Sequence, residues 1–560
     1  MNTKRKLLTV ICLFSCFLSM AQLGPVTKPF TEADTLRGTI TPERAWWDVI
    51  HYSIGVTPDY DAKSITGQVD IRFKVIAPGK KMQIDLQQPM ELTKASYGNL
   101  ALTYTRDGNV YYISFPGNLK KGITGKLALS FRGSPVIAKR PPWDGGWIFT
   151  KDKMGRPWMS VACQGLGASV WYPCKDHQSD EPDSGATLKI TVPDTLVAVG
   201  NGRLISKKSY SAGMLTYEWE VKNPINNYNI IPYIGKYVTW HETFAGEKGK
   251  LDCDYWVLDY ELDKAKEQFK QAPLMLRCFE HWMGPYPFYE DSYKLVQAPH
   301  LGMEHQSAVA YGNEFKNGYL GRDLSGTGWG LKWDFIIVHE SGHEWFANNI
   351  TSKDLADMWI HEGFTNYAET LYTECQSGVE AGNEYNYGTR KGIRNDVPII
   401  TAYGVNKQGS GDMYPKSGNM LHSIRHFMRD DEKFRNMLRF LNKKFYHQTV
   451  TTKDICNAMS GFIGKKLDKI FDQYLTTIKI PVLEYYFPDN KQSITYRWSN
   501  TVDGFDMPVL IKVGGKEVLI APVNTQWKSL GLKAGEADIV KPEEIEKQFY
   551  IKVKLADPAN

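Results

Sequence analysis

The residues between Val338 and Glu362 have the types and spacing of a catalytic metal site. His339 and His343 lie four positions apart, so on a helix both imidazoles share one face and can bind one metal ion. Glu340 lies beside them, where a carboxylate can take a proton from a water activated by the metal. Glu362 follows after eighteen intervening residues and supplies a third ligand. Two histidines and one glutamate leave a fourth position open, which is typical of a catalytic zinc, so the sequence predicts a zinc hydrolase.

The alternative interpretation is a surface helix that carries two exposed histidines and a glutamate. The residues from Phe335 to Val338 before the motif are apolar, and so are Trp345 and Phe346 after it. This helix is therefore expected to be buried. Buried imidazoles and carboxylates need partners, and a metal ion supplies one, so the apolar flanks favour the metal site.

Length and composition exclude some classes of function. A chain of 560 residues is too long for one hydrophobic core and predicts several domains. The content of 42% hydrophobic and 23% charged residues is ordinary for a folded soluble protein. Three basic residues at positions 4–6 supply three of the five net positive charges. The small remaining excess implies neither nucleic acid nor an anionic membrane surface as a partner.

Residues 1–21 are predicted to be a secretory signal peptide. A basic start at positions 4–6 precedes the apolar run Leu7–Met20, which is too short to span a membrane comfortably, and Ala21 ends a candidate cleavage site. An uncleaved anchor is one alternative. A lipid anchor at Cys16 is another, although the bulky Phe14 disfavours it. The protein is expected to be exported through a Sec-type signal to the periplasm or the extracellular space.

The cysteines do not form a recognisable framework. Six lie beyond the signal, and no two of them form a C-x-x-C pair. Cys163 and Cys174 are nearest in sequence, but the pattern leaves any disulfide pairing open. None has the surroundings of a zinc ligand.

Hydrophobic periodicity divides the chain into three regions. Short alternating runs of β-branched and aromatic residues from Trp46 to Trp240 predict an N-terminal all-β domain over residues 22–246. Helical spacing near 262–284, 333–350, 356–376, 417–429 and 432–446 predicts a mostly helical catalytic domain over 247–480. Strand patterns return in 481–560, where Val509–Ile520 is expected to form a hairpin around a Gly-Gly turn. The predicted class is multidomain α+β.

A second motif carries a resemblance to a known family. Gly302-Met303-Glu304-His305-Gln306 precedes the zinc motif by about thirty residues. The chain resembles peptidase family M1, the gluzincin aminopeptidases that include alanyl aminopeptidases and the leukotriene hydrolase, in which a G-x-M-E-N segment precedes H-E-x-x-H-x18-E. It departs from that pattern at His305 and at His361, where the family usually has Asn.

The resemblance implies roles for residues around the zinc. Glu304 would bind the free α-amine of the substrate, which agrees with the positive charge that an α-amino group carries at neutral pH. Gln164, in a segment of the β domain similar to one that reaches the family's active site, would contact the same amine, and Gly302 and Met303 would line the substrate. Tyr414, in Tyr-Pro-Lys-Ser-Gly, is the candidate donor to the oxyanion, with Tyr403 as its rival.

The resemblance also implies a fold and an activity. It predicts a saddle-like N-terminal β domain, a thermolysin-like catalytic domain with one zinc per chain, and an exopeptidase acting on peptides with a free N-terminus. About eighty residues follow the catalytic region and have strand patterns, so the large helical domain that caps longer relatives is expected to be absent and the site more open. A thermolysin-like zinc endopeptidase and an inactive peptide-binding homologue are the alternatives. The oligomeric state stays open.

Overall fold

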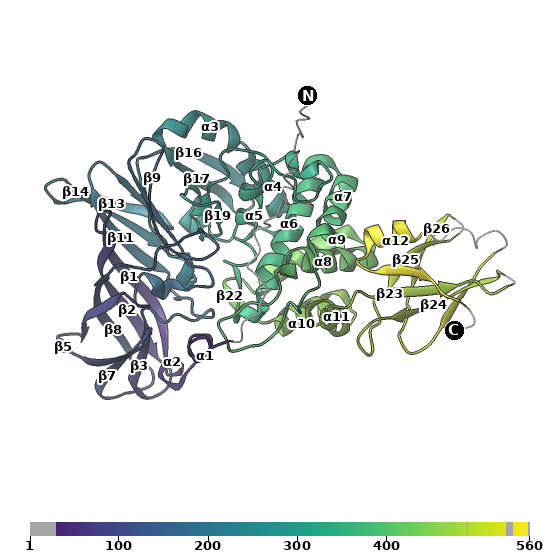
Figure 1. The fold of residues 1–560 in the computed structure, drawn as a ribbon, viewed down its shortest axis with the longest axis horizontal. Helices are drawn as coiled ribbons and strands as arrows, with labels where there is room; N and C mark the ends of the chain where they lie inside the picture. Colours follow the sequence, from purple (N-terminus) through teal and green to yellow (C-terminus); the bar gives the residue numbers. More distant parts are fainter. Residues whose placement is uncertain (1–29, 490, 514, 534–540, 558–560) are drawn as a thin grey trace, which may run out of the picture.

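The computed structural model describes residues 30–489, 491–513, 515–533 and 541–557 (Figure 1). The predicted signal peptide and Cys16 lie outside the described residues. A β-rich region, a mostly helical region and a smaller β region follow one another along the chain, and Figure 1 shows them side by side in that order.

The N-terminal region contains three sheets. The largest has eight strands in the order β13-β14-β11-β1-β2-β8-β4-β5, and smaller sheets have the orders β12-β15-β10-β9 and β3-β7-β6. In β2 (Ser64–Val75), Val69, Ile71, Phe73 and Val75 are buried and alternate with more exposed polar residues, as the sequence predicts. The other strands are β1 (Trp47–Asp59), β3 (Gly79–Asp85), β4 (Glu91–Tyr97), β5 (Leu100–Ala101), β6 (Thr103–Asp107), β7 (Val110–Leu119), β8 (Thr124–Gly133), β9 (Gly146–Lys151), β10 (Pro157–Ala162), β11 (Ala186–Pro193), β12 (Val197–Val199), β13 (Arg203–Ser211), β14 (Met214–Val221) and β15 (Tyr233–Gly235).

A five-stranded sheet begins the second region and carries the Gly302 segment at its edge. Its order is β16 (Tyr237–Gly246), β17 (Gly249–Leu258), β18 (Tyr293–Gln297), β20 (Val309–Tyr311) and β19 (Gly302–Met303). The predicted boundary after residue 246 falls in the turn of the β16–β17 hairpin, and the domain boundaries stay predictions. Because β19 pairs only with β20, its other edge is free of strand partners within the described chain.

Helices pack around this sheet. They are α3 (Leu262–Gln268), α4 (Gln271–Met283), α5 (Phe335–Gly342), α6 (Trp359–Ser377), α7 (Val379–Thr389), α8 (Pro415–Met428), α9 (Asp431–Lys444), α10 (Thr452–Ile463) and α11 (Asp468–Leu475). Figure 1 shows α5, α6 and β19 near one another at the centre of the molecule.

Two helices differ from their predicted lengths. The predicted helix over 262–284 is split into α3 and α4, because Pro273 has no N–H to donate to the carbonyl of Phe269. The helix predicted over 333–350 ends at Gly342, and the chain turns away through Ala347, whose φ is +153°. His343 keeps helical angles as the residue that caps α5, so it still shares a face with His339.

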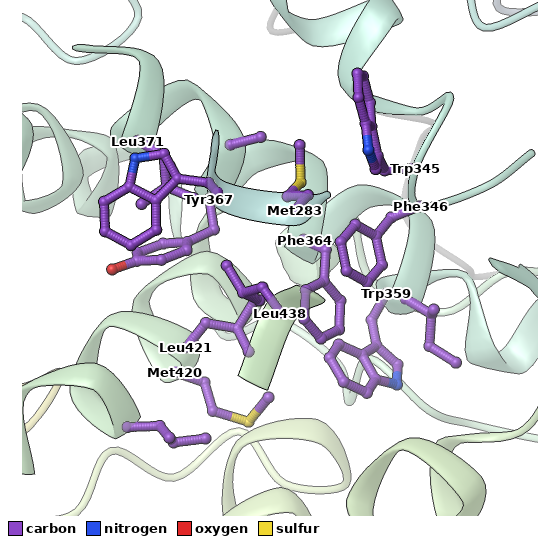
Figure 2. Packing of buried hydrophobic residues seen from close by; sticks show 14 of the residues in the cluster. Met283, Trp345, Phe346, Trp359, Phe364, Tyr367, Leu371, Met420, Leu421 and Leu438 are labelled. Carbon is purple, nitrogen blue, oxygen red and sulfur yellow. The ribbon is translucent and has the colours of Figure 1, made fainter. Parts of the chain in front are cut away.

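The core of the catalytic region lies under the zinc motif. Figure 2 shows part of it, where Phe346 stacks on Phe364 of α6 with ring centroids 4.1 Å apart and Trp359 lies 5.7 Å from Phe364. Aromatic packing of this kind fixes the loop after α5 against α6. It therefore holds the two segments that carry the metal-binding residues in one rigid body.

The C-terminal region is made of strands, as predicted. Its sheet has the order β27 (Lys528–Gly531), β24 (Ser493–Ser499), β23 (Val482–Tyr486) and β28 (Lys552–Leu555), with α12 (Pro542–Gln548) beside it. The predicted hairpin is confirmed as β25 (Val509–Val513) paired with β26 (Lys516–Ile520). This region shares one continuous hydrophobic core with the catalytic helices. Two short helices, α1 (Glu32–Gly38) and α2 (Pro42–Ala45), precede the first sheet.

A disulfide bond links two helices of the catalytic region. It joins Cys278 of α4 to Cys375 of α6, while Cys163 and Cys174 are both buried free thiols. The nearest pair in sequence is therefore not the bonded one, because the bond depends on a contact between helices that are far apart in sequence. Within the described residues, no helix has the length and apolar character needed to cross a bilayer.

Candidate zinc site and active-site cleft

The helix that carries the zinc motif begins at a buried carboxylate. Asp334 accepts hydrogen bonds from the backbone N–H groups of Ile336 (3.0 Å) and Ile337 (3.3 Å), which are free at a helix start. The same carboxylate accepts from Tyr311 of β20 (2.7 Å) and from Asn313 (2.8 Å). The start of α5 is therefore fixed to the end of β20.

The three predicted ligands converge on one point. His339 Nε2 and His343 Nε2 lie 3.3 Å apart, and Glu362 Oε2 lies 3.6 Å and 3.3 Å from them. Ligands of a tetrahedral zinc at about 2.0–2.1 Å are about 3.3–3.4 Å apart, so this spacing fits Zn²⁺. All three side chains are buried, and Glu362 Oε2 has no hydrogen-bond donor among the described residues. A buried carboxylate oxygen without a donor is costly unless a cation satisfies it.

The electrostatics of these residues agree with a cation site. Burial disfavours the charge on Glu362, yet His343 and His339 outweigh burial and lower the pKa of its carboxyl. Four carboxylates line the cleft, and none of the described residues that line it is Lys or Arg. The four are Glu304, Glu340, Glu362 and Glu369. A divalent cation offsets the mutual repulsion of such a group.

Glu369 orients the first zinc ligand and was missed by the sequence analysis. Its carboxylate lies 2.7 Å from His339 Nδ1, and it accepts a hydrogen bond from Tyr385 (2.6 Å). A carboxylate on the far nitrogen fixes the imidazole with Nε2 toward the metal. Glu369 is seven residues after Glu362, two turns along α6 on the same face, and that spacing was a usable signal.

Replacing Glu369 with glutamine is expected to weaken zinc binding about 10- to 100-fold, because the neutral amide holds His339 less firmly. Competition with a chromophoric chelator measures the zinc dissociation constant. Glu380→Gln, an exposed position on α7, is the matched control and should leave it unchanged. Equal zinc affinity in the Glu369 variant and the wild type contradicts the orienting role.

Glu340 lies next to the ligands and is not needed as one. A Cβ atom built on Gly302 would come within 2.7 Å of Glu340 Oε1 and 2.9 Å of Ile336 Cγ2, so the glycine lets β19 approach the Glu340 carboxylate. Burial raises the pKa of Glu340 to about 7, and a neighbouring cation lowers that value. A carboxylate in this position can accept and return a proton.

Glu304 and Gln164 meet although 140 positions separate them in sequence. Gln164 Nε2 donates to Glu304 Oε1 over 2.5 Å, and the hydroxyl of Tyr228 donates to the same oxygen over 2.9 Å. An ionised carboxylate can accept about four hydrogen bonds, so capacity for an ammonium group remains. Tyr228 was not identified from the sequence, because nothing local distinguishes it among 31 tyrosines.

The segment that carries Glu304 is fastened to the zinc motif by two buried side chains. Asn348 Nδ2 donates to the carbonyl of Glu304 over 2.7 Å, and Glu344 accepts from the backbone N–H of Ser307 over 2.8 Å.

The two histidines that replace the usual asparagines of the family motifs contact other groups. His305 Nδ1 pairs with the Tyr233 hydroxyl, and His361 Nε2 accepts from the N–H of Ser352. The two substitutions are therefore accommodated beside the site and not among the ligands.

The structure separates the two candidate tyrosines. Tyr414 lines the cleft, and its ring stacks near His339 with centroids 6.0 Å apart. Burial, together with the negative charges of Glu362 and Glu304, raises the pKa of Tyr414 well above its usual value, so it remains a proton donor. Tyr403 instead donates to Asp357 and does not line the cleft.

These groups share one cavity of about 170 Å³. An oxygen of Glu304, an oxygen of Glu340 and a ring nitrogen of His343 all lie within 4.8 Å of one another. Gln164, Gly302, Met303, Glu362 and Tyr414 line the same cavity. The structure therefore brings together every site residue that the sequence singled out except the rival Tyr403.

Comparison with known proteins finds one family. Residues 280–474 match the model of the peptidase family M1 domain. Aminopeptidase N from Lactococcus lactis subsp. lactis is 24% identical over 267 residues, which cover 43% of this chain and 30% of that protein. Aminopeptidase M1 from Arabidopsis thaliana is 22% identical over 477 residues, which cover 79% of this chain and 51% of that protein. The matched part thus spans about half of these relatives or less.

Solved structures share the fold. A variant of an M1 zinc metallopeptidase from Deinococcus radiodurans, bound to a Tyr-Ser-Ala substrate, superposes with a TM-score of 0.64 at 21% identity, and the match covers 79% of this chain and 97% of that one. The predicted β-rich and helical catalytic regions are confirmed by this likeness. The chain thus contains a region, residues 280–474, that matches the peptidase family M1 domain, and its fold is similar to that of M1 zinc metallopeptidases.

Proposed function

We propose that this protein is an exported zinc aminopeptidase that removes the N-terminal residue from peptides. The observation that carries the proposal is the position of Glu304. Its buried carboxylate, held by Gln164 and Tyr228, lies within 4.8 Å of both Glu340 and His343. A fixed anion beside a zinc site is suited to a substrate whose ammonium group is close to the bond that is cleaved.

The zinc ligands and Glu340 supply the hydrolytic chemistry. A zinc ion held by His339, His343 and Glu362 would polarise the substrate carbonyl and acidify a water molecule. Glu340 takes the proton of the attacking water on a carboxylate oxygen and returns it to the leaving nitrogen. The Tyr414 hydroxyl donates to the developing oxyanion, and loss of one such donor typically costs about 3–4 kcal/mol of barrier lowering.

Glu304 and Gln164 would restrict cleavage to the N-terminal residue of a peptide, because they bind the substrate ammonium group. Glu304 accepts from the substrate ammonium, and the amide oxygen of Gln164 offers a second acceptor. Because Glu304 lies within 4.8 Å of His343, it can hold the ammonium of the same residue whose carbonyl would face the zinc. The similarity to aminopeptidase N and aminopeptidase M1 supports the same activity. Export through residues 1–21 is part of the proposal and is supported by the sequence pattern alone.

A comparison of free and blocked peptides tests the exopeptidase activity. Ala-Phe-Ala-amide is expected to lose its first alanine with a kcat/KM about 10²-fold or more above that of its Nα-acetyl twin, because blocking removes the charge that Glu304 pairs with. Chromatography of the products measures both rates and identifies the bond that is cut. Equal cleavage of the acetylated peptide, or cleavage at internal bonds, supports an endopeptidase instead.

A further inference from the structure

Two neighbouring parts of the cleft can be distinguished by the groups that line them. Glu304 and Gln164 mark the part that receives the ammonium group. Glu340 lies close against Gly302, two residues before Glu304, and an oxygen of Glu340 is within 4.8 Å of an oxygen of Glu304. On the proposed function, Glu340 returns its proton to the leaving nitrogen, so the second residue of the peptide must lie on this side.

An apolar wall encloses this side of the cleft. We call it the leaving-side wall and define it by four cleft-lining residues: Tyr319, Leu324, Phe335 and Ile336. Ile336 is one helical turn before Glu340 and also abuts Gly302. Phe335 stacks on His339 with ring centroids 5.0 Å apart, and Tyr319 meets Phe335 edge to face at 5.4 Å.

The loop that contributes Tyr319 and Leu324 is fastened in place. The N–H of Gly318 donates to the carbonyl of Trp333 over 2.7 Å. Asp323 accepts from the N–H of Ser325 over 2.9 Å and from the N–H of Gly328 over 2.5 Å. A loop with these internal bonds presents a preformed surface, which lowers the entropy cost of binding a side chain against it.

We propose that the leaving-side wall makes the enzyme select peptides whose second residue is large and apolar, with Leu324 as a specificity-determining residue. This inference rests on the proposed aminopeptidase activity. Glu340 lines the cleft beside this wall, and no Lys or Arg is among the described residues that line the cleft. An acidic second residue would be desolvated next to that carboxylate without a cationic partner, whereas an apolar side chain gains burial.

Four peptides that differ only in the second residue test the preference. Ala-Phe-Ala-amide and Ala-Leu-Ala-amide are expected to be hydrolysed with a kcat/KM about 10- to 100-fold above those of Ala-Gly-Ala-amide and Ala-Asp-Ala-amide. The C-terminal amides remove the effect of a terminal carboxylate. Equal rates on all four, or faster hydrolysis of the aspartyl peptide, overturn this inference alone. No hydrolysis of any of them overturns the proposed function and this inference with it.

Substitutions in the loop that carries Leu324 test whether the leaving-side wall causes the preference for an apolar second residue. Leu324→Arg places a cation there and is expected to lower the ratio of kcat/KM for the leucyl over the aspartyl peptide at least about tenfold. Leu324→Ala should lower the ratio of kcat/KM for the leucyl peptide over kcat/KM for the glycyl peptide. This variant provides the test if Leu324→Arg does not fold. Leu331→Arg is the matched control, since Leu331 is 44% exposed and does not line the cleft. An unchanged ratio in folded Leu324→Arg, or an equal fall in the control, overturns the proposal.

Discussion

Glutamine in place of Glu340 is expected to lower kcat about 10²- to 10⁴-fold while the zinc content stays at one ion per chain. The amide fills the same space beside Gly302 but cannot accept the proton of the attacking water. Metal binding is preserved because the converging donors are His339 Nε2, His343 Nε2 and Glu362 Oε2. Steady-state hydrolysis of Ala-Phe-Ala-amide gives kcat, and elemental analysis of the dialysed protein gives zinc.

The thermal unfolding midpoint of this variant provides its control. It should equal or exceed that of the wild type, since the substitution removes one of four crowded carboxylates. A kcat within threefold of the wild-type value contradicts the proton-transfer role. Loss of zinc in parallel with activity means that Glu340 belongs to the ligand set.

Removal of the Glu304 side chain is expected to reduce kcat/KM on free-amine peptides by about 30- to 5,000-fold, which corresponds to about 2–5 kcal/mol. The substrate ammonium then loses the buried carboxylate that pairs with it. Zinc content should not change, because the three donors spaced for zinc are those of His339, His343 and Glu362. The informative readout is selectivity: the ratio of rates for free and acetylated Ala-Phe-Ala-amide should fall toward one in Glu304→Ala.

Tyr228→Phe separates the charge of Glu304 from its orientation. This variant removes one of the two donors to Oε1 and keeps the carboxylate, so a smaller fall in kcat/KM is expected, with the free-amine preference retained. A Glu304→Ala enzyme that still prefers free amines as strongly as the wild type contradicts the assignment. Such a result would transfer amine recognition to Gln164 or to a group outside this pair.

The zinc ligands could be predicted from the sequence because their signal is local. His339 and His343 are one helical turn apart, and any helix places them together regardless of how the rest folds. Glu362 could be added because it begins a second apolar helical stretch. The alternation in Gly67–Val75 predicted a half-buried strand for the same reason, since the side-chain period belongs to the strand itself.

Features that depend on tertiary contacts were not accessible in this way. Tyr228 approaches Glu304 only through the packing of the β-rich region against β19, and no residue near it in sequence indicates that contact. The bond between Cys278 and Cys375 joins residues 97 positions apart, and the sequence pattern left the pairing of the cysteines open. The pairing of Gln164 with Glu304 was reached through the family resemblance, because spacing carries no information over such a separation.

The end of α5 is an intermediate case. The apolar pattern continues through Phe346 and predicts a longer helix, but those aromatic residues pack in a loop against α6. Hydrophobic periodicity reports burial, and a buried loop satisfies the pattern as well as a helix does when side chains bond its backbone. His343 Nδ1 illustrates this, since it lies 3.1 Å from the carbonyl of Phe346 in that loop.

Anomalous X-ray scattering at the zinc absorption edge, measured on crystals of the folded protein, tests the metal site most directly. A single strong peak is expected at about 2.0–2.2 Å from His339 Nε2, His343 Nε2 and a carboxylate oxygen of Glu362. Glu340 and Glu304 should lie near the peak without being bonded to it. The absence of a peak from protein crystallised with equimolar zinc, or a peak bonded to other residues, would contradict the account.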